Sequence, residues 1–185
     1  MPEFVFGHRL LSTVKSTSTT QDIQKFAFVA LGSNLGDSRA TVLEALERLQ
    51  ALSDQPLLKS SLLQTLPVDC PPESPMFVNA VAGLLPRPDE TAESLLGKLQ
   101  AIEQEFGRSR SGVRNAARTL DLDLIAFGSE TRAHEKLILP HPRAHLRRFV
   151  LEPLAEIAPD FVLPGQTKTA RELLRQLAEA PTGEK

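Results

Sequence analysis

Between residues 107 and 127 the chain reads GRSRSGVRNAARTLDLDLIAF, and this stretch decides how the rest is interpreted. Its first half is a glycine-punctuated loop with four arginines, and its second half is an apolar strand with two carboxylates. Side chains two residues apart leave a strand on the same face. We therefore expect Asp121 and Asp123 to point one way, while Leu120, Leu122 and Leu124 point into the opposite face.

Two neighbouring carboxylates resist ionising together, so a positive group should sit between them. The candidates are the nearby arginines or a hard cation. Mg²⁺ prefers one or two carboxylates together with substrate phosphates, and arginine forks suit phosphate oxygens. The stretch therefore indicates a site for a metal–polyphosphate complex. The alternative is a plain Arg/Asp ion-pair network at the edge of a sheet.

The run of residues 118–123, preceded by Gly107-Arg108-x-Arg110, resembles the signature of 6-hydroxymethyl-7,8-dihydropterin pyrophosphokinases, enzymes of folate biosynthesis. The resemblance extends from about residue 26 to residue 164. It includes Gly32-Ser33-Asn34-Leu35-Gly36 near the start and a nearly intact run over residues 140–159. It implies transfer of a pyrophosphoryl group from ATP to the hydroxymethyl oxygen of the pterin, with release of AMP.

The resemblance also implies roles for individual residues. Arg108 and Arg118 would neutralise charge on the transferred group, and Asp121 and Asp123 would hold two Mg²⁺ ions; these four are the expected catalytic residues. The expected ATP-binding residues are Gln100, Glu103, Arg110, Arg114, Asn115, Leu124, Lys136, His141, Pro142 and Arg147. The expected pterin-binding residues are Thr65, Pro67, Val68, Phe77, Asn79 and Phe149, with the two phenylalanines stacking on the ring.

The chain departs from the family pattern at two places. It has Asn115-Ala116-Ala117 where the family commonly has Trp-Gly-Pro, and Pro142 where the residue after the histidine is often Tyr. Both changes fall in or beside segments that cover the nucleotide. We expect them to weaken closure over ATP rather than to abolish the reaction.

Composition sets the broad class. A chain of 185 residues with 41% hydrophobic residues and a net charge of −2 is an ordinary globular protein with no overall attraction to nucleic acid or membrane. Its single cysteine, Cys70, suits a reducing cytoplasm. We expect a flexible extension over residues 1–25, a single domain over residues 26–180, and a monomer whose partners are small molecules.

The pattern of elements predicts the fold class. Short apolar runs predict strands, an apolar stripe at helical spacing predicts a helix over about residues 38–52, and Asp89 is expected to cap a second helix. A capping box formed by Thr169 and Glu172 predicts a C-terminal helix. The order of elements indicates an α+β, ferredoxin-like antiparallel sheet with helices on one face and additional C-terminal helices. The expected strands are residues 26–31, 57–66, 77–85 and the strand with the two aspartates.

Two other functions use similar folds. A ferredoxin-like RNA-binding module would use the arginines on phosphates. Such modules place aromatic residues on the central strands, whereas this chain is expected to carry carboxylates on the exposed face of its sheet. A metal-dependent nucleotidyl transferase or cyclase of the palm type would also use two aspartates, but it would not account for residues 65–79. Stabilisation by pterin, by ATP with Mg²⁺ or by RNA distinguishes the three classes.

Overall fold

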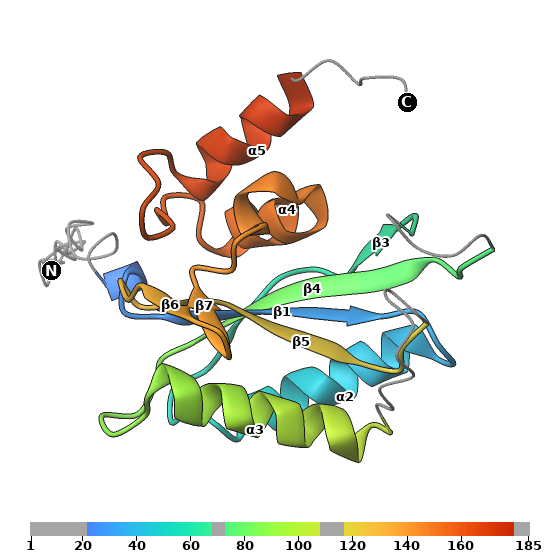
Figure 1. The fold of residues 1–185 in the computed structure, drawn as a ribbon. Helices are drawn as coiled ribbons and strands as arrows, with labels where there is room; N and C mark the ends of the chain where they lie inside the picture. Colours follow the sequence, from blue (N-terminus) through green and yellow to red (C-terminus); the bar gives the residue numbers. More distant parts are fainter. Residues whose placement is uncertain (1–21, 68–72, 108–116, 180–185) are drawn as a thin grey trace, which may run out of the picture.

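The structure is a computed structural model, and it describes residues 22–67, 73–107 and 117–179. A five-stranded sheet is interleaved along the chain with two helices, and a hairpin and a C-terminal helical region follow (Figure 1). The elements in chain order are β1 (Ala27–Ser33), α2 (Ser38–Gln50), β2 (Leu58–Lys59), β3 (Leu63–Thr65), β4 (Phe77–Leu84), α3 (Ala92–Glu105), β5 (Asp121–Phe127), β6 (Arg132–His134), β7 (Leu137–Leu139), the 3₁₀ helix η1 (Ala144–Leu146), α4 (Arg148–Ile157) and α5 (Ala170–Glu179).

The main sheet is antiparallel throughout and has the order β2-β4-β1-β5, with β3 also paired to β4. The two helices α2 and α3 connect strands at the places that the predicted element order requires. This is the ferredoxin-like arrangement, and the prediction of fold class is confirmed. Strands β6 and β7 form a separate two-stranded hairpin.

Helices α2 and α3 cover one face of the sheet. Helix α2 buries Val42, Ala45, Leu46 and Leu49, the stripe that its sequence spacing predicts. The leucines of β5 belong to the same core, with Leu122 5% exposed and the residues on either side of it only half-buried. The alternation expected for the aspartate strand is therefore present.

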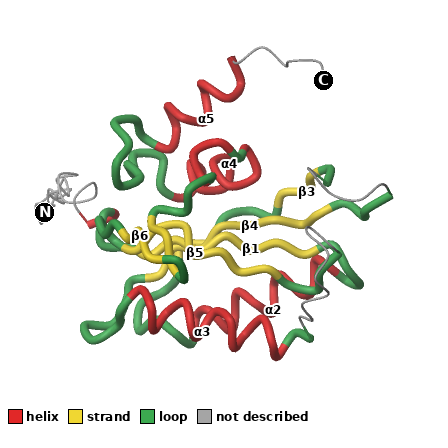
Figure 2. The backbone as a smooth tube through the Cα atoms, viewed as in Figure 1, coloured by secondary structure: helices red, strands yellow, loops and turns green. Residues whose placement is uncertain are grey.

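Helix α4 covers part of the other face, and α5 packs on α4 (Figure 2). A second core forms where Phe28, Val81 and Ile125 of the sheet meet Leu151 and Leu154 of α4. These sheet residues lie toward one end of their strands. The other end of the same face carries Gly32, Asn79 and Asp121, which do not belong to this core, and it supplies the floor of the candidate site.

The structure differs from the sequence expectations at several boundaries. The first strand, expected over residues 26–31 with Gly32 at its end, runs from Ala27 to Ser33 and so includes Gly32. The strand expected over residues 57–66 is divided into β2 and β3, because a bulge interrupts its pairing with β4. The N-cap of α3 is Thr91 rather than Asp89: Thr91 has the extended backbone that a cap requires, and its hydroxyl accepts the Ser94 N–H at 3.1 Å.

Residues 22–25, which fall within the expected extension, form a turn ahead of β1, and Ile23 packs against the second core. Residues 1–21 lie outside the described part of the chain. Among the described helices, none has the length and apolarity needed to cross a membrane.

Candidate active site

The floor of the site is a row of residues aligned across three strands. Asp121 of β5 lies opposite Gly32 of β1, and Gly32 lies opposite Asn79 of β4. Directly paired residues share a face of the sheet, so the carboxylate and the amide project on the same side. A Cβ added at Gly32 would lie 3.2 Å from Asn79 Oδ1. The missing side chain therefore keeps the space between Asp121 and Asn79 open, a role that the sequence did not reveal because Gly32 was expected to end the strand.

Each aspartate of β5 pairs with an arginine. Arg118 Nη1 lies 2.5 Å from Asp121 Oδ2, and Arg147 Nη1 lies 3.9 Å from Asp123 Oδ2. The Asp123 side chain is 41% exposed and that of Asp121 is 22% exposed, so both can be reached from solvent. Positive charge thus sits where the sequence required it. The Arg/Asp ion pairs of the alternative interpretation are thus present in this structure as well.

Asn34 holds the segment that delivers Arg118. It is 2% exposed, and its Oδ1 accepts the Arg118 N–H at 2.9 Å, while its own N–H donates to the Arg118 carbonyl at 3.2 Å. Its Nδ2 donates to the Pro75 carbonyl at 3.4 Å. One buried amide therefore joins the end of β1, the approach to β5 and the approach to β4. Sequence reasoning did not select Asn34 as a site residue, although it lies within the glycine-flanked motif after β1.

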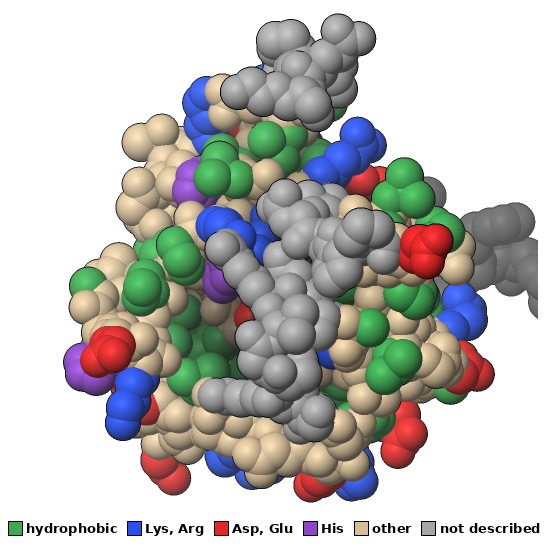
Figure 3. All heavy atoms as spheres, turned by 45° about the vertical axis from the view of Figure 1, so that its right-hand side comes forward, with side chains coloured by type: hydrophobic (Ala, Val, Ile, Leu, Met, Phe, Trp, Pro, Cys, Tyr) green, Lys and Arg blue, Asp and Glu red, His purple; other side chains and the backbone are tan. Residues whose placement is uncertain are grey.

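His141 and Arg147 lie on the side of the site toward α4. The His141 N–H donates to the Ile125 carbonyl at 2.8 Å, and its Nδ1 accepts the Arg143 N–H at 3.2 Å. Burial lowers the pKa of His141 below its ordinary value; Arg147 and Arg143 lower it further, and Asp123 opposes them. Burial and the neighbouring Arg143 also lower the pKa of Arg147. Figure 3 shows basic and histidine side chains gathered in the middle of this face, beside a hollow with hydrophobic walls.

The lowered pKa of His141 predicts a pH dependence of stability. A histidine titrates near pH 6.5 in an unfolded chain, so below that pH the unfolded state binds the proton more readily than the native state. Stability from this group is therefore present above about pH 6.5 and is lost as the pH falls through the lower native pKa. We expect wild-type Tm to fall on acidification, and His141→Gln to remove roughly 1–3 °C of that fall.

Thermal unfolding between about pH 7 and pH 5 measures this difference. His134→Gln is the matched control, because His134 lies on the exposed β6–β7 hairpin. An identical slope for His141→Gln and the wild type would contradict the assignment.

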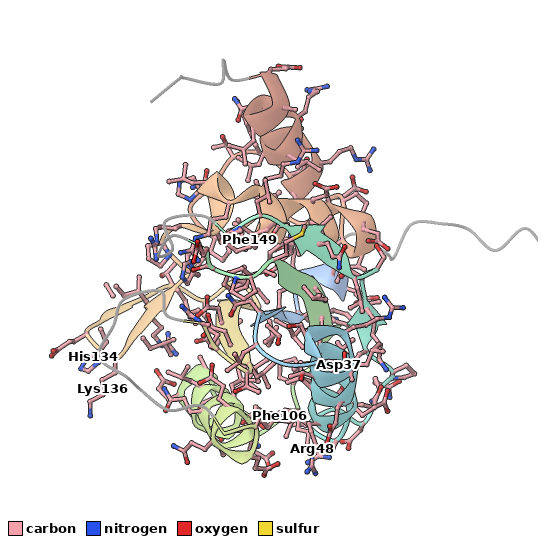
Figure 4. The ribbon with its side chains drawn as sticks, turned by 90° about the vertical axis from the view of Figure 1, so that its right-hand side faces the viewer. Asp37, Arg48, Phe106, His134, Lys136 and Phe149 are labelled. Atoms are coloured by element: carbon pink, nitrogen blue, oxygen red, sulfur yellow. The ribbon has the colours of Figure 1, made fainter. Side chains whose placement is uncertain are left out.

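The opposite side of the floor carries the expected pterin-binding residues. Asn79 is 6% exposed, and its Nδ2 donates to Thr65 Oγ1 at 2.8 Å. Phe77 lies opposite Thr65 in the β3–β4 pair. Phe149, in the first turn of α4, lies between that helix and the sheet (Figure 4), and the Arg147 guanidinium carbon is 5.4 Å from the centre of its ring.

Four expected ATP-binding residues lie apart from this cluster or are used structurally. Lys136 is exposed at the tip of the β6–β7 hairpin and points away from the sheet (Figure 4). Gln100 is exposed on α3, and the side chain of Leu124 is buried in the core with α2 and α3. Glu103 is 4% exposed, and its Oε1 accepts the Leu122 N–H at 2.7 Å, so it anchors α3 to β5.

Of the remaining candidates, Pro67 is half-buried and Pro142 is exposed. Five lie outside the described residues: Val68, Arg108, Arg110, Arg114 and Asn115. Within the described ranges, no group of three or more His, Cys, Asp or Glu side chains is arranged to hold a metal ion. Any metal here would depend on the Asp121/Asp123 pair together with ligands from the substrate.

The sequence matches the family model described as 7,8-dihydro-6-hydroxymethylpterin-pyrophosphokinase (HPPK) over residues 28–159. It is 40% identical over 154 residues to the Haemophilus influenzae 2-amino-4-hydroxy-6-hydroxymethyldihydropteridine pyrophosphokinase, covering 83% of this chain and 93% of that protein. A Pseudomonas aeruginosa protein of the same name is also 40% identical over 154 residues, covering 91% of that protein.

Solved structures agree on the fold. The wild-type Plasmodium falciparum HPPK-DHPS matches with a TM-score of 0.62 at 13% sequence identity, covering 86% of this chain. This chain spans 47% of that protein, less than half of its length.

Proposed function

Because the chain belongs to the 7,8-dihydro-6-hydroxymethylpterin-pyrophosphokinase family, we propose that the open end of the sheet face is where it transfers a pyrophosphoryl group to the pterin alcohol. The chain catalyses this transfer in folate biosynthesis, with ATP as the co-substrate and AMP as the product. The observation that supports the location is the Asp121–Gly32–Asn79 row. It places carboxylates for the phosphate end and an amide for the heterocycle on one surface, separated by an open strip.

The phosphate end is formed by Arg118, His141 and Arg147 around the two aspartates. In the ligand-free protein the arginines neutralise the carboxylates. The oxygens of a bound triphosphate would replace the carboxylates as partners of these guanidinium groups, because the planar fork of an arginine suits phosphate geometry. The neutral His141 can donate one hydrogen bond to a phosphate oxygen without adding repulsion against the arginines. Arg108, Arg110, Arg114 and Asn115 complete the proposed nucleotide site.

Asp121 and Asp123 fit a magnesium site. They share one face of β5 and remain partly exposed, as suits an ion that takes few protein carboxylates and completes its shell with phosphates and water. We propose that they hold two Mg²⁺ ions, which would neutralise charge on the triphosphate and favour ionisation of the attacking hydroxyl. Phosphoryl transfer otherwise asks the protein for positioning and electrostatic stabilisation.

The pterin end is formed by Asn79, Thr65, Phe77 and Phe149. Asn79 presents both a donor and an acceptor, and its bond to Thr65 fixes which way the amide faces. The two aromatic rings approach from the sheet and from α4, so a flat heterocycle can stack between them. Pro67 and Val68 would complete this end. Gly32 leaves the passage from the ring to the phosphates free.

Phe149→Ala tests the stacking role. We expect it to weaken pterin binding by roughly tenfold, because aromatic stacking contributes on the order of 1 kcal/mol beyond the area buried. The Kd for ATP should change little. Calorimetric titration with each ligand measures both values. Equal losses for the two ligands would show that Phe149 acts as a packing residue of α4, and Phe161→Leu, deep in the second core, gives the reference for a pure packing change.

The direct test of function is release of AMP from ATP on addition of 6-hydroxymethyl-7,8-dihydropterin and Mg²⁺. We expect release that depends on all three components. RNA oligonucleotides should neither replace the pterin nor stabilise the protein. Release of pyrophosphate without pterin would point to nucleotidyl transfer and would overturn the proposal.

We further propose that residues 26–180 form the single catalytic domain of this chain, acting as a monomer in a reducing cytoplasm without nucleic-acid or membrane partners. The single Cys70 and the modest net charge support this. Size-exclusion chromatography with light scattering tests the monomer.

A further inference from the structure

A bulge divides the strand that brings Thr65 to the site. Strand β2 ends with Lys59 opposite Ala82, and β3 begins with Leu63 opposite Asn79. Three residues of one strand therefore face two residues of β4. A bulge of this kind adds one residue to a strand and shifts the pairing register that follows it.

The bulge decides which face Thr65 occupies. Side chains alternate along a strand, so a register shift of one residue exchanges the two faces. With the additional residue, Thr65 lies opposite Phe77 and shares the face of Asn79, and its hydroxyl accepts the Asn79 Nδ2 donor at 2.8 Å. Without it, Gln64 would take that place and Thr65 would face α2. The pterin end of the site thus depends on the bulge.

One backbone bond and two side chains hold the bulge. The Ser60 N–H donates to the Val81 carbonyl at 3.0 Å, and the Ser60 hydroxyl accepts the Val81 N–H at 3.0 Å. The next residue, Ser61, turns away from β4. Its N–H donates to both carboxylate oxygens of Glu156, at 3.0 and 3.1 Å, and its hydroxyl donates to Glu156 Oε2 at 2.7 Å.

Glu156 belongs to α4, the helix whose first turn carries Phe149. The inner side of α4 is fixed by Leu151 and Leu154, which are both 0% exposed. The carboxylate therefore joins a helix anchored on the sheet to the bulge at its edge. Hydrogen bonds to a charged acceptor are stronger than neutral ones, and here three donor contacts converge on one group.

We infer that Glu156 is a positioning residue for the pterin end of the site. By holding Ser61, it keeps the bulge in place and with it the register of Thr65 against Asn79. Because Glu156 belongs to α4, it also sets the separation between β3 and Phe149, which would lie on the other side of the pterin ring. This inference rests on the proposed function of the open face. In this proposal Glu156 acts through Ser61 and is not itself a ligand-binding residue.

Hydrogen exchange of the ligand-free protein tests the structural part. In Glu156→Ala, the backbone amides of residues 61–65 should exchange at least about tenfold faster than in the wild type, while those of β1 stay unchanged. Glu152→Ala is the matched control, since Glu152 lies one turn earlier on α4 and pairs with Arg148 at the surface, 2.9 Å away. Unchanged exchange at residues 61–65 in Glu156→Ala would overturn the inference whatever the enzyme's activity.

Ligand binding tests the functional part. A small displacement of a binding group has a large effect on a site of fixed geometry, so Glu156→Ala should raise the Kd for pterin by roughly tenfold and the Kd for ATP by less than about twofold. Glu156→Gln keeps an acceptor for the Ser61 N–H and should recover most of the pterin affinity. Equal increases for both ligands, or no recovery in Glu156→Gln, would contradict a positioning role.

The two tests separate the failure of this inference from the failure of the proposed function. If the wild type does not bind pterin, the proposed function is wrong, yet the exchange measurement still reports on the link between Glu156 and the bulge. If Glu156→Ala does not fold, Ser61→Ala removes only the hydroxyl contact. That variant should show a smaller loss of pterin affinity in the same direction, and unaltered affinity there would overturn the inference.

Discussion

Replacing Asp123 by alanine should lower kcat by roughly 100-fold or more while leaving the fold intact, as expected when a group that stabilises developing charge is removed. The side chain is 41% exposed and lies outside both hydrophobic cores, so its loss removes little packing. Its ion pair with Arg147 spans 3.9 Å and is partly exposed, so it contributes little to stability. The measurement is AMP release at saturating pterin, ATP and Mg²⁺.

Two variants accompany it. Asp123→Asn keeps the size and removes the charge, and it should lose nearly as much activity. Asp160→Ala removes an exposed aspartate that pairs with Arg171 at 2.9 Å, and it should keep wild-type kcat. Wild-type turnover in Asp123→Ala at saturating Mg²⁺ would remove Asp123 from the proposed metal site. If instead Tm falls and the loss of kcat is matched by the loss of folded, active protein, the role of Asp123 is structural.

Arg118→Ala should also lower kcat by about 100-fold, with a smaller change in the KM for ATP. An interaction made only in the transition state affects turnover, whereas one made equally in the ground state affects KM. Arg118 can act in this selective way because Asn34 bonds both its backbone N–H and its carbonyl, and Asp121 holds its side chain at 2.5 Å. The Arg118 side chain is therefore preorganised before the substrate binds.

Steady-state and single-turnover kinetics test this prediction. Arg118→Lys keeps the charge but loses the planar fork, so it should recover only part of kcat. Arg110→Ala is expected to raise the KM for ATP or to alter product release. Arg87→Ala, which removes a surface arginine paired with Asp54 at 2.8 Å, serves as the neutral control. The same kinetic profile for Arg118→Ala and Arg110→Ala would contradict the assignment of different roles to these two arginines.

Several features of the fold could be predicted because they depend on neighbours along the chain. The alternation of Asp121 and Asp123 with buried leucines follows from the geometry of a strand, and the inward stripe of α2 follows from that of a helix. The capping box was also correct: Glu172 Oε2 accepts the Thr169 N–H at 2.8 Å and its hydroxyl at 2.9 Å. In each case the interacting residues lie within one or two turns.

The helix cap shows where local reasoning fails even at short range. Asp89 and Thr91 are both suitable cap residues by type, and the structure places Thr91, not Asp89, in the extended conformation at the helix start. The residue types near a helix start therefore do not decide which of them caps it.

By itself, the sequence determined the class of fold and the family and predicted the residues of the two ends of the proposed site, because these depend on periodicity and on a motif that is continuous along the chain. Tertiary structure alone decided how those ends meet. Gly32 lies between Asp121 and Asn79 and leaves the space between them open only because three strands pair there. Asn34 bonds to Arg118, 84 residues away in the sequence. The bulge at Ser61 is bonded to Glu156, 95 residues away. Periodicity cannot reveal a register shift or a long-range hydrogen bond, because both are fixed only when distant segments pack against one another.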